Sequence, residues 1–401
     1  MDKKMKIIVL VLSLLAALEP LSIDLYLPAF KDIADNLQVE LSEVQLSLSV
    51  FLAGFALGQL FWGPLSDQYG RKKPILIAMT LFTLSSLASI YANQIHQLWV
   101  IRFLQAFGGC AGVVIGRAVV NDLFDGRYRT KVFSLLTIIS GVAPIIAPTL
   151  GNLLLKYWHW HGIFNTTSLL GVLSILLVAL FLPGKEQAVV SPVVPKPSFS
   201  VGSLLKSYVR VMANMPFMIY TIIGCMAYGS LMVYVSNAPY LIMEKGGFSG
   251  DTFSIIFAVN AIGLLFGTYI IDFLLRFTSL KRLVRYTIGV QLLLNLLLLG
   301  CAVAGSPVVP MLVLIFLNLI PVGLLLPATT SLGLSYFTDD SGTASAFMGF
   351  LQLFFTGLLS AAVSYMQNDS VIPMMGGIFF CSFASFLLLS TGKGRRVIAT
   401  A

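Results

Sequence analysis

Four ionisable side chains stand within stretches that are otherwise apolar. Glu19 and Asp24 follow the apolar run that starts at Ile7, while Arg102 and Arg117 lie in a later run. An ionisable group inside a membrane helix costs about 2.5–3.5 kcal/mol on insertion scales, so each is a functional candidate. Loss of water favours a protonated carboxyl, whereas a nearby guanidinium favours the carboxylate. A carboxyl switched between these environments would exchange protons; a permanent Asp–Arg pair would merely hold helices together.

The depths of these groups match if their two helices are antiparallel neighbours. At 1.5 Å per residue, Asp24 lies roughly 25 Å from the inner end of its helix, and Arg102 lies about 6 Å from the outer end of its own. These levels coincide in a hydrocarbon core of about 30 Å, with Glu19 and Gln105 about one turn deeper. We therefore predict a proton-coupling or gating site at Asp24, Glu19 and Arg102. The role of Arg117 stays open.

The elements that must position these groups are membrane-spanning helices. The chain of 401 residues is 57% hydrophobic and 10% charged, with a mean hydropathy of +0.91. This composition excludes a soluble enzyme, a disordered chain and a nucleic-acid-binding module. A span needs about 20 apolar residues. We predict an all-α polytopic membrane protein with twelve spans, at residues 7–28, 42–63, 74–93, 97–121, 131–154, 162–182, 216–240, 251–274, 284–304, 308–331, 343–366 and 371–391.

The placement of Lys and Arg predicts the orientation. Of the 25 such residues, only Lys31, Lys156 and Lys245 fall in loops on one side, and nearly all others fall in segments on the opposite side. Cytoplasmic loops carry the excess of Lys and Arg, so we expect both termini to be cytoplasmic. The lysines before the first apolar run resemble a signal peptide. No clear cleavage site follows, so we expect this run to remain as the first span.

A polar, proline-rich segment divides the chain. It starts at Pro183 and predicts a linker between two halves. We expect a six-helix bundle at residues 1–182, a cytoplasmic linker at 183–214 and a second six-helix bundle at 215–401. Apolar residues of this linker recur at helical spacing, which predicts an amphipathic helix on the inner leaflet. They are Val201, Leu204, Leu205, Tyr208, Val209 and Met212.

Glycine and proline mark points where the backbone could bend. One span contains Pro144, Pro148 and Gly151, and a later span contains Pro321, Gly323 and Pro327. Proline removes a helical hydrogen bond, and small residues let helices approach closely. These features favour a protein that changes shape, although prolines tolerated in membrane helices are the alternative. No Cys or His cluster has the spacing of a metal site, so we expect no metal.

The loop after the second span has the most specific local pattern. It runs from Gly63 through Asp67, Gly70 and Arg71 to Pro74. We expect glycine to permit a sharp turn, Asp67 to cap a helix or pair with a basic group, and Arg71 to stay at the anionic membrane face.

That loop resembles the signature between the second and third helices of the major facilitator superfamily. Asp24-Leu-Tyr-Leu-Pro28 looks like the first-helix pattern of the Bcr/CflA drug-resistance transporters. The segment from Arg102 to Gly108 is similar to the superfamily's fourth-helix motif, and Pro144, Pro148 and Gly151 resemble a variant of its fifth-helix motif. Asn121 stands before Asp122 where that family usually has Arg, a departure that concerns coupling more than fold.

The resemblance implies two pseudo-symmetric six-helix bundles around a central cavity that opens alternately to each side. It implies export of drugs in exchange for protons across a bacterial inner membrane, by a monomer, with no cofactor besides the proton gradient. Asp67 and Arg71, with Gly63 and Gly70, would act in the conformational switch, together with Pro144, Pro148 and Gly151. The cavity would include Tyr26, Gln105, Tyr228, Asn237, Tyr240 and Asn318.

Two other functions remain open. One is transport of a single metabolite such as a purine nucleoside or a sugar. The other is a membrane-embedded enzyme, which would need nucleophile–base pairs or metal ligands at membrane depth. The few buried ionisable groups form no such set.

Overall fold

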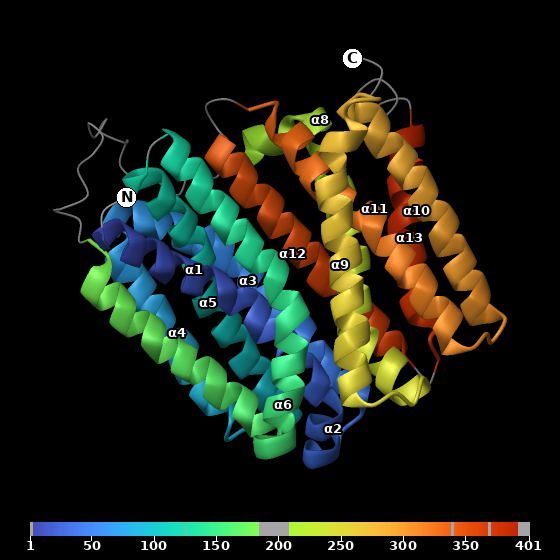
Figure 1. The fold of residues 1–401 in the computed structure, drawn as a ribbon, viewed down its shortest axis with the longest axis horizontal. Coiled ribbons are helices and arrows are strands. Elements are labelled where there is room, and N and C mark those ends of the chain that lie inside the picture. The colour runs from blue at the N-terminus through green and yellow to red at the C-terminus, as the bar shows by residue number, and fades with distance from the viewer. Residues whose placement is uncertain (1–2, 125, 184–207, 338–340, 368–369, 392–401) are drawn as a thin grey trace. The chain divides into compact units, whose positions relative to one another are not determined.

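The computed structural model describes residues 3–124, 126–183, 208–337, 341–367 and 370–391. Nearly all of them lie in helices (Figure 1). The helices are α1 (Lys3–Asp24), α2 (Phe30–Leu37), α3 (Leu41–Tyr69), α4 (Lys72–Ser89), α5 (Ile95–Leu123), α6 (Gly126–Phe181), α8 (Met215–Pro239), α9 (Gly250–Leu274), α10 (Leu280–Val303), α11 (Val308–Leu334), α12 (Ser341–Met366) and α13 (Ile372–Ser390). Short 3-10 and π helices occupy Leu27–Ala29 and Tyr240–Lys245.

Within the described residues, ten helices are long and apolar enough to cross a membrane. One of these, α6, contains two predicted spans, because His159 has non-helical angles (φ 52°, ψ −169°) that divide it. The 18-residue α4 matches the predicted span at 74–93. The described helices therefore account for all twelve predicted spans. Residues 184–207, which hold most of the predicted linker, lie outside the described part.

Contacts divide the chain into two compact units, Met1–Glu40 with Val50–Ser203, and Leu41–Ser49 with Leu204–Ala401. In the first unit, α1 and α4 each pack against α5 and α6. In the second, α8 packs against α11, α12 and α13, while α10 packs against α11 and α13. Several neighbour pairs have counterparts in the other unit: α1 with α5 corresponds to α8 with α11, and α4 with α5 corresponds to α10 with α11. This repeat is the pseudo-symmetry expected of the fold.

Glycines set matching close approaches in the two units. A side chain at Gly54 or Gly58 would meet the backbone oxygen of Phe103 or Phe107. A side chain at Gly263 or Gly267 would meet the backbone oxygen of Phe316 or Ile320. In each unit the two glycines are four residues apart, and so are the two residues that they face. Phe103 therefore corresponds to Phe316, and Phe107 to Ile320. Gln105 of α5 therefore corresponds to Asn318 of α11, and Arg102 corresponds to Ile315.

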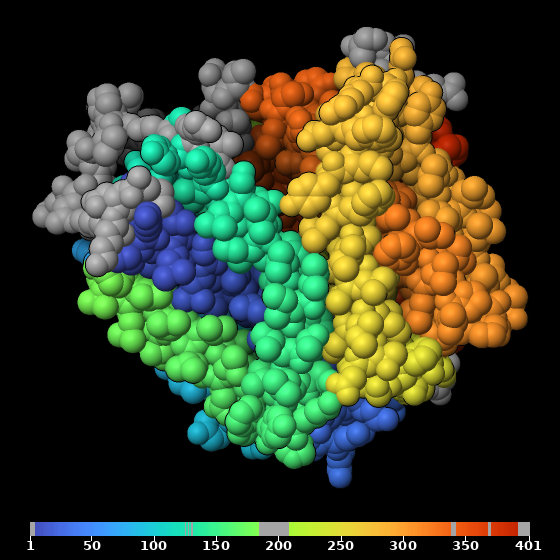
Figure 2. Space-filling view, in the orientation of Figure 1, coloured from blue at the N-terminus to red at the C-terminus, as the bar shows by residue number. Residues whose placement is uncertain are grey.

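The exposed surfaces of the helices are apolar. Figure 2 shows α9, in yellow, as a continuous ridge on the surface of the second unit. Its exposed large side chains recur at helical spacing: Ile255, Val259, Ile262, Phe266, Tyr269 and Phe273. In a soluble protein such surface would be unfavourable, whereas in a bilayer it faces lipid tails. The chain is a multi-pass membrane protein.

Two predicted element boundaries were wrong in informative ways. The first span was expected to reach Pro28, but α1 ends at Asp24. Proline has no N–H, so Pro28 cannot donate to the carbonyl of Asp24 four residues before it. The second span was expected to end at Gly63, but α3 continues through Gly63 to Tyr69. The turn instead occurs at Gly70, whose φ of 83° favours glycine.

The predicted amphipathic helix is only partly within the described residues, where 208–213 are helical. Tyr208 packs on Phe347 with 5.8 Å between ring centroids, and Val211 is buried beside them. Val209 and Met212 are exposed. Tyr208 and Val211 thus pack against the second unit, and the predicted contact of Val209 and Met212 with the inner leaflet stays a prediction.

Candidate functional site

Arg102 lies at the centre of a buried polar site in the first unit. Its side chain is 1% exposed. Its Nη1 donates to Oε1 of Gln105 at 2.6 Å, and its Nη2 donates to the main-chain oxygen of Ser22 at 3.1 Å. Ser22 precedes Asp24 by two residues on α1. The hydrogen bond to Ser22 thus brings together the parts of α1 and α5 that the sequence predicts to be level.

Aromatic rings surround the guanidinium. Its Cζ lies 4.3 Å from the ring centroids of both Tyr26 and Phe51, and 5.9 Å from that of Phe164. All three rings are buried. At these distances the negative face of a ring attracts a cation. Tyr26 also packs edge-on against Phe30, with 5.0 Å between centroids, so its position is fixed by packing.

No carboxylate among the described residues lies within 4 Å of the Arg102 nitrogens. Its Nε has no hydrogen-bond partner there either. Asp24 is 4% exposed and ends α1. Glu19 is partly buried on the same helix, within range of the charge of Arg117. In this structure Asp24 and Arg102 thus lie on adjacent helices without forming an ion pair.

Gln105 links the arginine to α4. Its Nε2 donates to Oγ of Ser86 at 2.8 Å, and Ser86 in turn donates to the main-chain oxygen of Phe82 at 2.8 Å. The amide of Gln105 therefore has partners on both its oxygen and its nitrogen. It fixes one edge of the guanidinium.

The predicted cavity residues of the second unit are buried polar groups on α8, α11 and the π-helix. Asn237 donates to the main-chain oxygen of Val233 at 2.8 Å, and its Oδ1 has no partner among the described residues. The same is true of Oδ1 of Asn318. Tyr240 is buried and Tyr228 partly so. α8 and α11 contain no Asp, Glu, Lys or Arg.

One polar pair in this unit was missed as a site. Asn260 of α9 donates to the hydroxyl of Tyr234 on α8 at 2.6 Å, and both side chains are buried. Asn260 is an amide within the apolar stretch of α9, which was the available signal. Its partner could not be found, because the two residues are 26 positions apart and lie on different helices.

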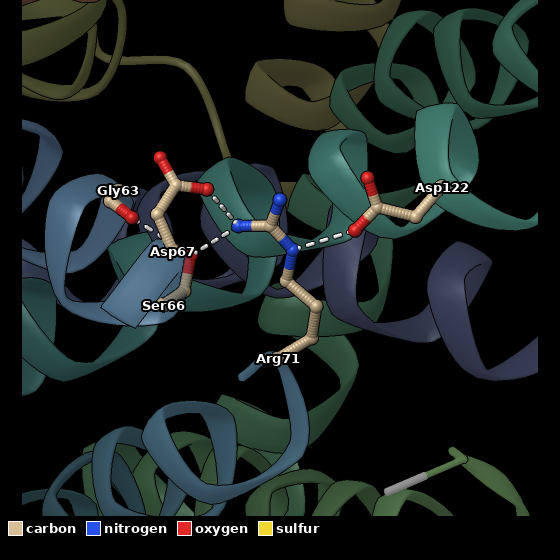
Figure 3. Close-up of polar contacts among 5 residues, drawn as sticks. All are labelled: Gly63, Ser66, Asp67, Arg71 and Asp122. Atoms are coloured by element: carbon tan, nitrogen blue, oxygen red, sulfur yellow. Dashed lines mark hydrogen bonds and ion pairs between the residues drawn. The ribbon is translucent and has the colours of Figure 1, made fainter. Parts of the chain in front are cut away.

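A second cluster lies at the predicted inner end of the first unit (Figure 3). Arg71 sits between two carboxylates, with Nη1 2.5 Å from Asp67 Oδ1 and Nε 2.7 Å from Asp122 Oδ2. Nη1 also donates to Oγ of Ser66 at 2.8 Å, and Ser66 donates to the main-chain oxygen of Gly63 at 2.8 Å. This cluster joins the α3–α4 turn to the end of α5.

Electrostatics favour the charged form of Arg71. Burial lowers the pKa of its guanidinium, but the hydrogen bond and charge of Asp122, with the charge of Asp67, outweigh burial and raise that pKa. Asp122 was not among the predicted switch residues. The sequence signal was its place at the end of a span, close to two basic loops.

The remaining predicted switch residues lie in α6. Pro144 and Pro148 are inside the helix. A side chain on Gly151 would collide with the backbone of Leu25, just after the end of α1. Gly151 thus allows α6 to approach the segment that follows Asp24 directly.

Comparisons with known proteins agree on one family. The profile of the Major Facilitator Superfamily matches residues 12–361. The uncharacterised MFS-type transporter YdgK of Bacillus subtilis is 37% identical over 374 residues, covering 92% of this chain and 90% of that protein. A bicyclomycin resistance protein homologue of Haemophilus influenzae is 27% identical over 389 residues, covering 96% of each.

A solved structure has the same fold. The crystal structure of a D-xylose–proton symporter superposes with a TM-score of 0.77, covering 96% of this chain and 97% of that one. Their sequence identity is 13%, so this likeness concerns the fold alone.

Proposed function

We propose that this chain, which belongs to the Major Facilitator Superfamily of transporters, is a proton-coupled exporter of amphipathic drug-like molecules. It would work by alternating access in a bacterial inner membrane, as a monomer with both termini cytoplasmic. The proton gradient would drive it without a cofactor. The two bundles, residues 1–182 and 215–401, would move about the linker.

The observation that carries this proposal is the arrangement of Arg102 and Asp24. A buried guanidinium, with no carboxylate partner among the described residues, lies beside a helix that ends in a buried aspartate. Such groups are expensive in a membrane and are found where protons or ions move. If Asp24 and Arg102 only held helices together, they would be expected to form an ion pair. If Asp24 carries protons, its carboxyl must separate from Arg102 when protonated and pair with it again when ionised.

In the proposed cycle, Asp24 takes up a proton from outside and releases it inside, with Glu19 as a second acceptor. Arg102 stabilises the ionised carboxylate. The substrate binds among Tyr26, Gln105 and the polar residues of the second unit, namely Tyr228, Asn237, Tyr240 and Asn318. The export of drugs is supported by the likeness to a bicyclomycin resistance protein homologue.

The inner cluster would favour one shape of the carrier. Arg71 holds Asp67 and Asp122 together and so fixes the ends of α3, α4 and α5 relative to one another. We propose that this rigid end stabilises the outward-facing state. Pro144, Pro148 and Gly151 would let α6 bend and slide during the change.

Transport of one neutral metabolite is the second candidate. Asn237 and Asn318 present oxygens that have no partner among the described residues, and α8 and α11 carry no charge. Such groups suit the hydroxyls of a sugar or nucleoside.

Purified protein in proteoliposomes with an imposed pH gradient separates these candidates. We expect saturable, gradient-driven movement of bicyclomycin, a phenicol or ethidium. Saturable transport of a single nucleoside or sugar, with no response to any drug, would support the metabolite carrier instead.

A further inference from the structure

Arg102 has an unusual set of partners for a buried cation. The guanidinium donates to one amide oxygen and one main-chain oxygen. Aromatic rings also surround it: those of Tyr26 and Phe51 lie 4.3 Å from its Cζ, and that of Phe164 lies 5.9 Å away. Tyr26 comes from the segment after α1, and Phe51 comes from α3. Within the described part of the chain, the cation is thus held without an anion.

Few titratable groups can influence this site. The nearby ones are Asp24 and Glu19 on α1, the phenol of Tyr26, and the thiol of Cys110, which lies about two turns beyond Arg102 on α5 and within range of the charge of Glu19. The other charged or titratable residues of the helices packed here lie toward helix ends, beside the kink of α6, or more than three turns along α5; they include Glu43, Asp67, Lys72, Lys73, His96, Arg117, Asp122, His159 and His161. Among the described residues, Asp24 and Glu19 are therefore the acids that compete with the rings for Arg102.

We propose that Tyr26 and Phe51 form an aromatic cage that holds the charge of Arg102 while Asp24 is protonated. In this inference, which rests on the proposed proton coupling, the guanidinium alternates between two positions. With Asp24 ionised it pairs with the carboxylate; with Asp24 protonated it returns to the rings. Tyr26 and Phe51 are positioning residues, and the strength of the cage sets the pH at which Asp24 exchanges its proton.

The direction of the effect follows from this balance. A weaker cage destabilises the protonated state of the site relative to the paired state. Asp24 then holds its proton less tightly, and the midpoint of its titration moves to lower pH. Fluorine on a phenylalanine ring withdraws charge from the ring face but hardly changes the ring's shape, so it weakens cation binding without opening a cavity.

The experiment is an infrared titration of the full-length protein in liposomes. The carboxyl band of Asp24 is identified by its loss in Asp24→Asn, and its midpoint is measured with mono-, di- and trifluorophenylalanine at position 51. We expect a graded shift to lower pH, reaching about 0.5–1 unit. Phe51→Leu should shift the midpoint similarly, whereas Phe51→Tyr, which keeps an aromatic ring, should leave it near the wild-type value.

Phe55 provides the matched control. It is as buried as Phe51 and lies one turn further along α3, and no cation contact to it exists among the described residues. The same fluorinated residues there should leave the midpoint unchanged. An unshifted midpoint at position 51, or equal shifts at both positions, would overturn the cage. If the wild type showed no gradient-driven transport, the proposed coupling would be wrong. The infrared titration needs no substrate, so this outcome is distinct from failure of the cage.

Discussion

At the scale of single residues, the contacts around Arg102 partly compensate the loss of hydration of its guanidinium. Removing a guanidinium from water is costly unless hydrogen bonds and attraction replace its hydration. Here Gln105, Ser22 and two rings supply that replacement. Each desolvated cation–π contact is worth about 2 kcal/mol, and a hydrogen bond to a charged group about 1.5–3 kcal/mol. These contacts stabilise Arg102 without a carboxylate partner in the described part of the chain, and the proposed proton exchange at Asp24 would depend on that.

Gln105→Leu tests this compensation. The substitution removes the acceptor of Arg102 and the donor to Ser86, so we expect a loss of about 2–3 kcal/mol and a clearly lower melting temperature. Gln291→Leu is the control, since Gln291 is equally buried but its Nε2 has no partner among the described residues. Replacing Gln291 should be neutral or stabilising. Equal losses in both variants would contradict the assigned role of Gln105.

Arg71→Lys tests the inner cluster. Lysine keeps the charge but cannot reach two carboxylates in the fixed geometry of a guanidinium. Because Asp67 and Asp122 are both partly exposed, we expect a modest loss of about 1 kcal/mol in stability. The loss should shrink at high salt, as measured by thermal unfolding. Lys73→Gln, an exposed change at the start of α4, should have little effect. If it matched Arg71→Lys, net charge alone would explain the loss.

At the scale of helices, glycines determine which elements touch. A side chain on Gly267 would lie about as close as 2.9–3.1 Å to backbone carbons of Ile320, and backbone cannot move aside cheaply. The same arrangement holds for Gly54 against Phe103 in the first unit. These crossings fix the depth at which α5 and α11 present their polar residues.

Gly267→Ala should therefore destabilise the protein by about 1–3 kcal/mol. Gly289→Ala in α10 is the control, because nothing lies within 4 Å of a side chain built there. Alanine favours a helix by about 1 kcal/mol over glycine, so this variant should be neutral or more stable. Thermal unfolding of the two variants distinguishes crowding from helix propensity; a stable Gly267→Ala protein would show that α9 and α11 can separate.

The sequence predicts the spans well because hydropathy and length are local properties. It also points to Asp24, Arg102 and Arg71 as candidates, since ionisable groups are conspicuous in apolar runs and a repeated basic loop. It does not reveal that Phe51 contacts Arg102, because one phenylalanine among many carries no mark of its neighbour 51 positions away. The end of α1 at Asp24 was predictable from Pro28. The structure of the α3–α4 turn beyond Gly63, in contrast, involves a tertiary contact, that of Arg71 with Asp122.

At the scale of the whole molecule, the two units are similar in fold but differ in the ionisable groups that their helices contain. The two units repeat one arrangement of helices, yet Arg102 corresponds to Ile315, and Gln105 corresponds to Asn318. The ionisable groups at membrane depth thus belong to the first unit, while α8 and α11 of the second offer only neutral polar groups. We infer that proton exchange belongs to the first unit and that the second contributes neutral contacts to the substrate.

The orientation of the chain is a separate prediction. The excess of Lys and Arg on one set of loops predicts that both termini lie in the cytoplasm. Green fluorescent protein fused after Ala401 should fluoresce, and alkaline phosphatase fused there should be inactive. Fusions after residues of the predicted outer loop near Lys245 should give the reverse pattern. An active phosphatase at the C-terminus would contradict the twelve-span topology.

The central claim is that Asp24 couples transport to protons, and its most direct test is a comparison of two transport modes in proteoliposomes. In the wild type, an imposed pH gradient should drive ethidium against its concentration. In Asp24→Asn, gradient-driven transport should vanish, while exchange of labelled for unlabelled ethidium without a gradient should persist, because the cavity and fold remain intact. Full gradient-driven transport by Asp24→Asn would contradict the account.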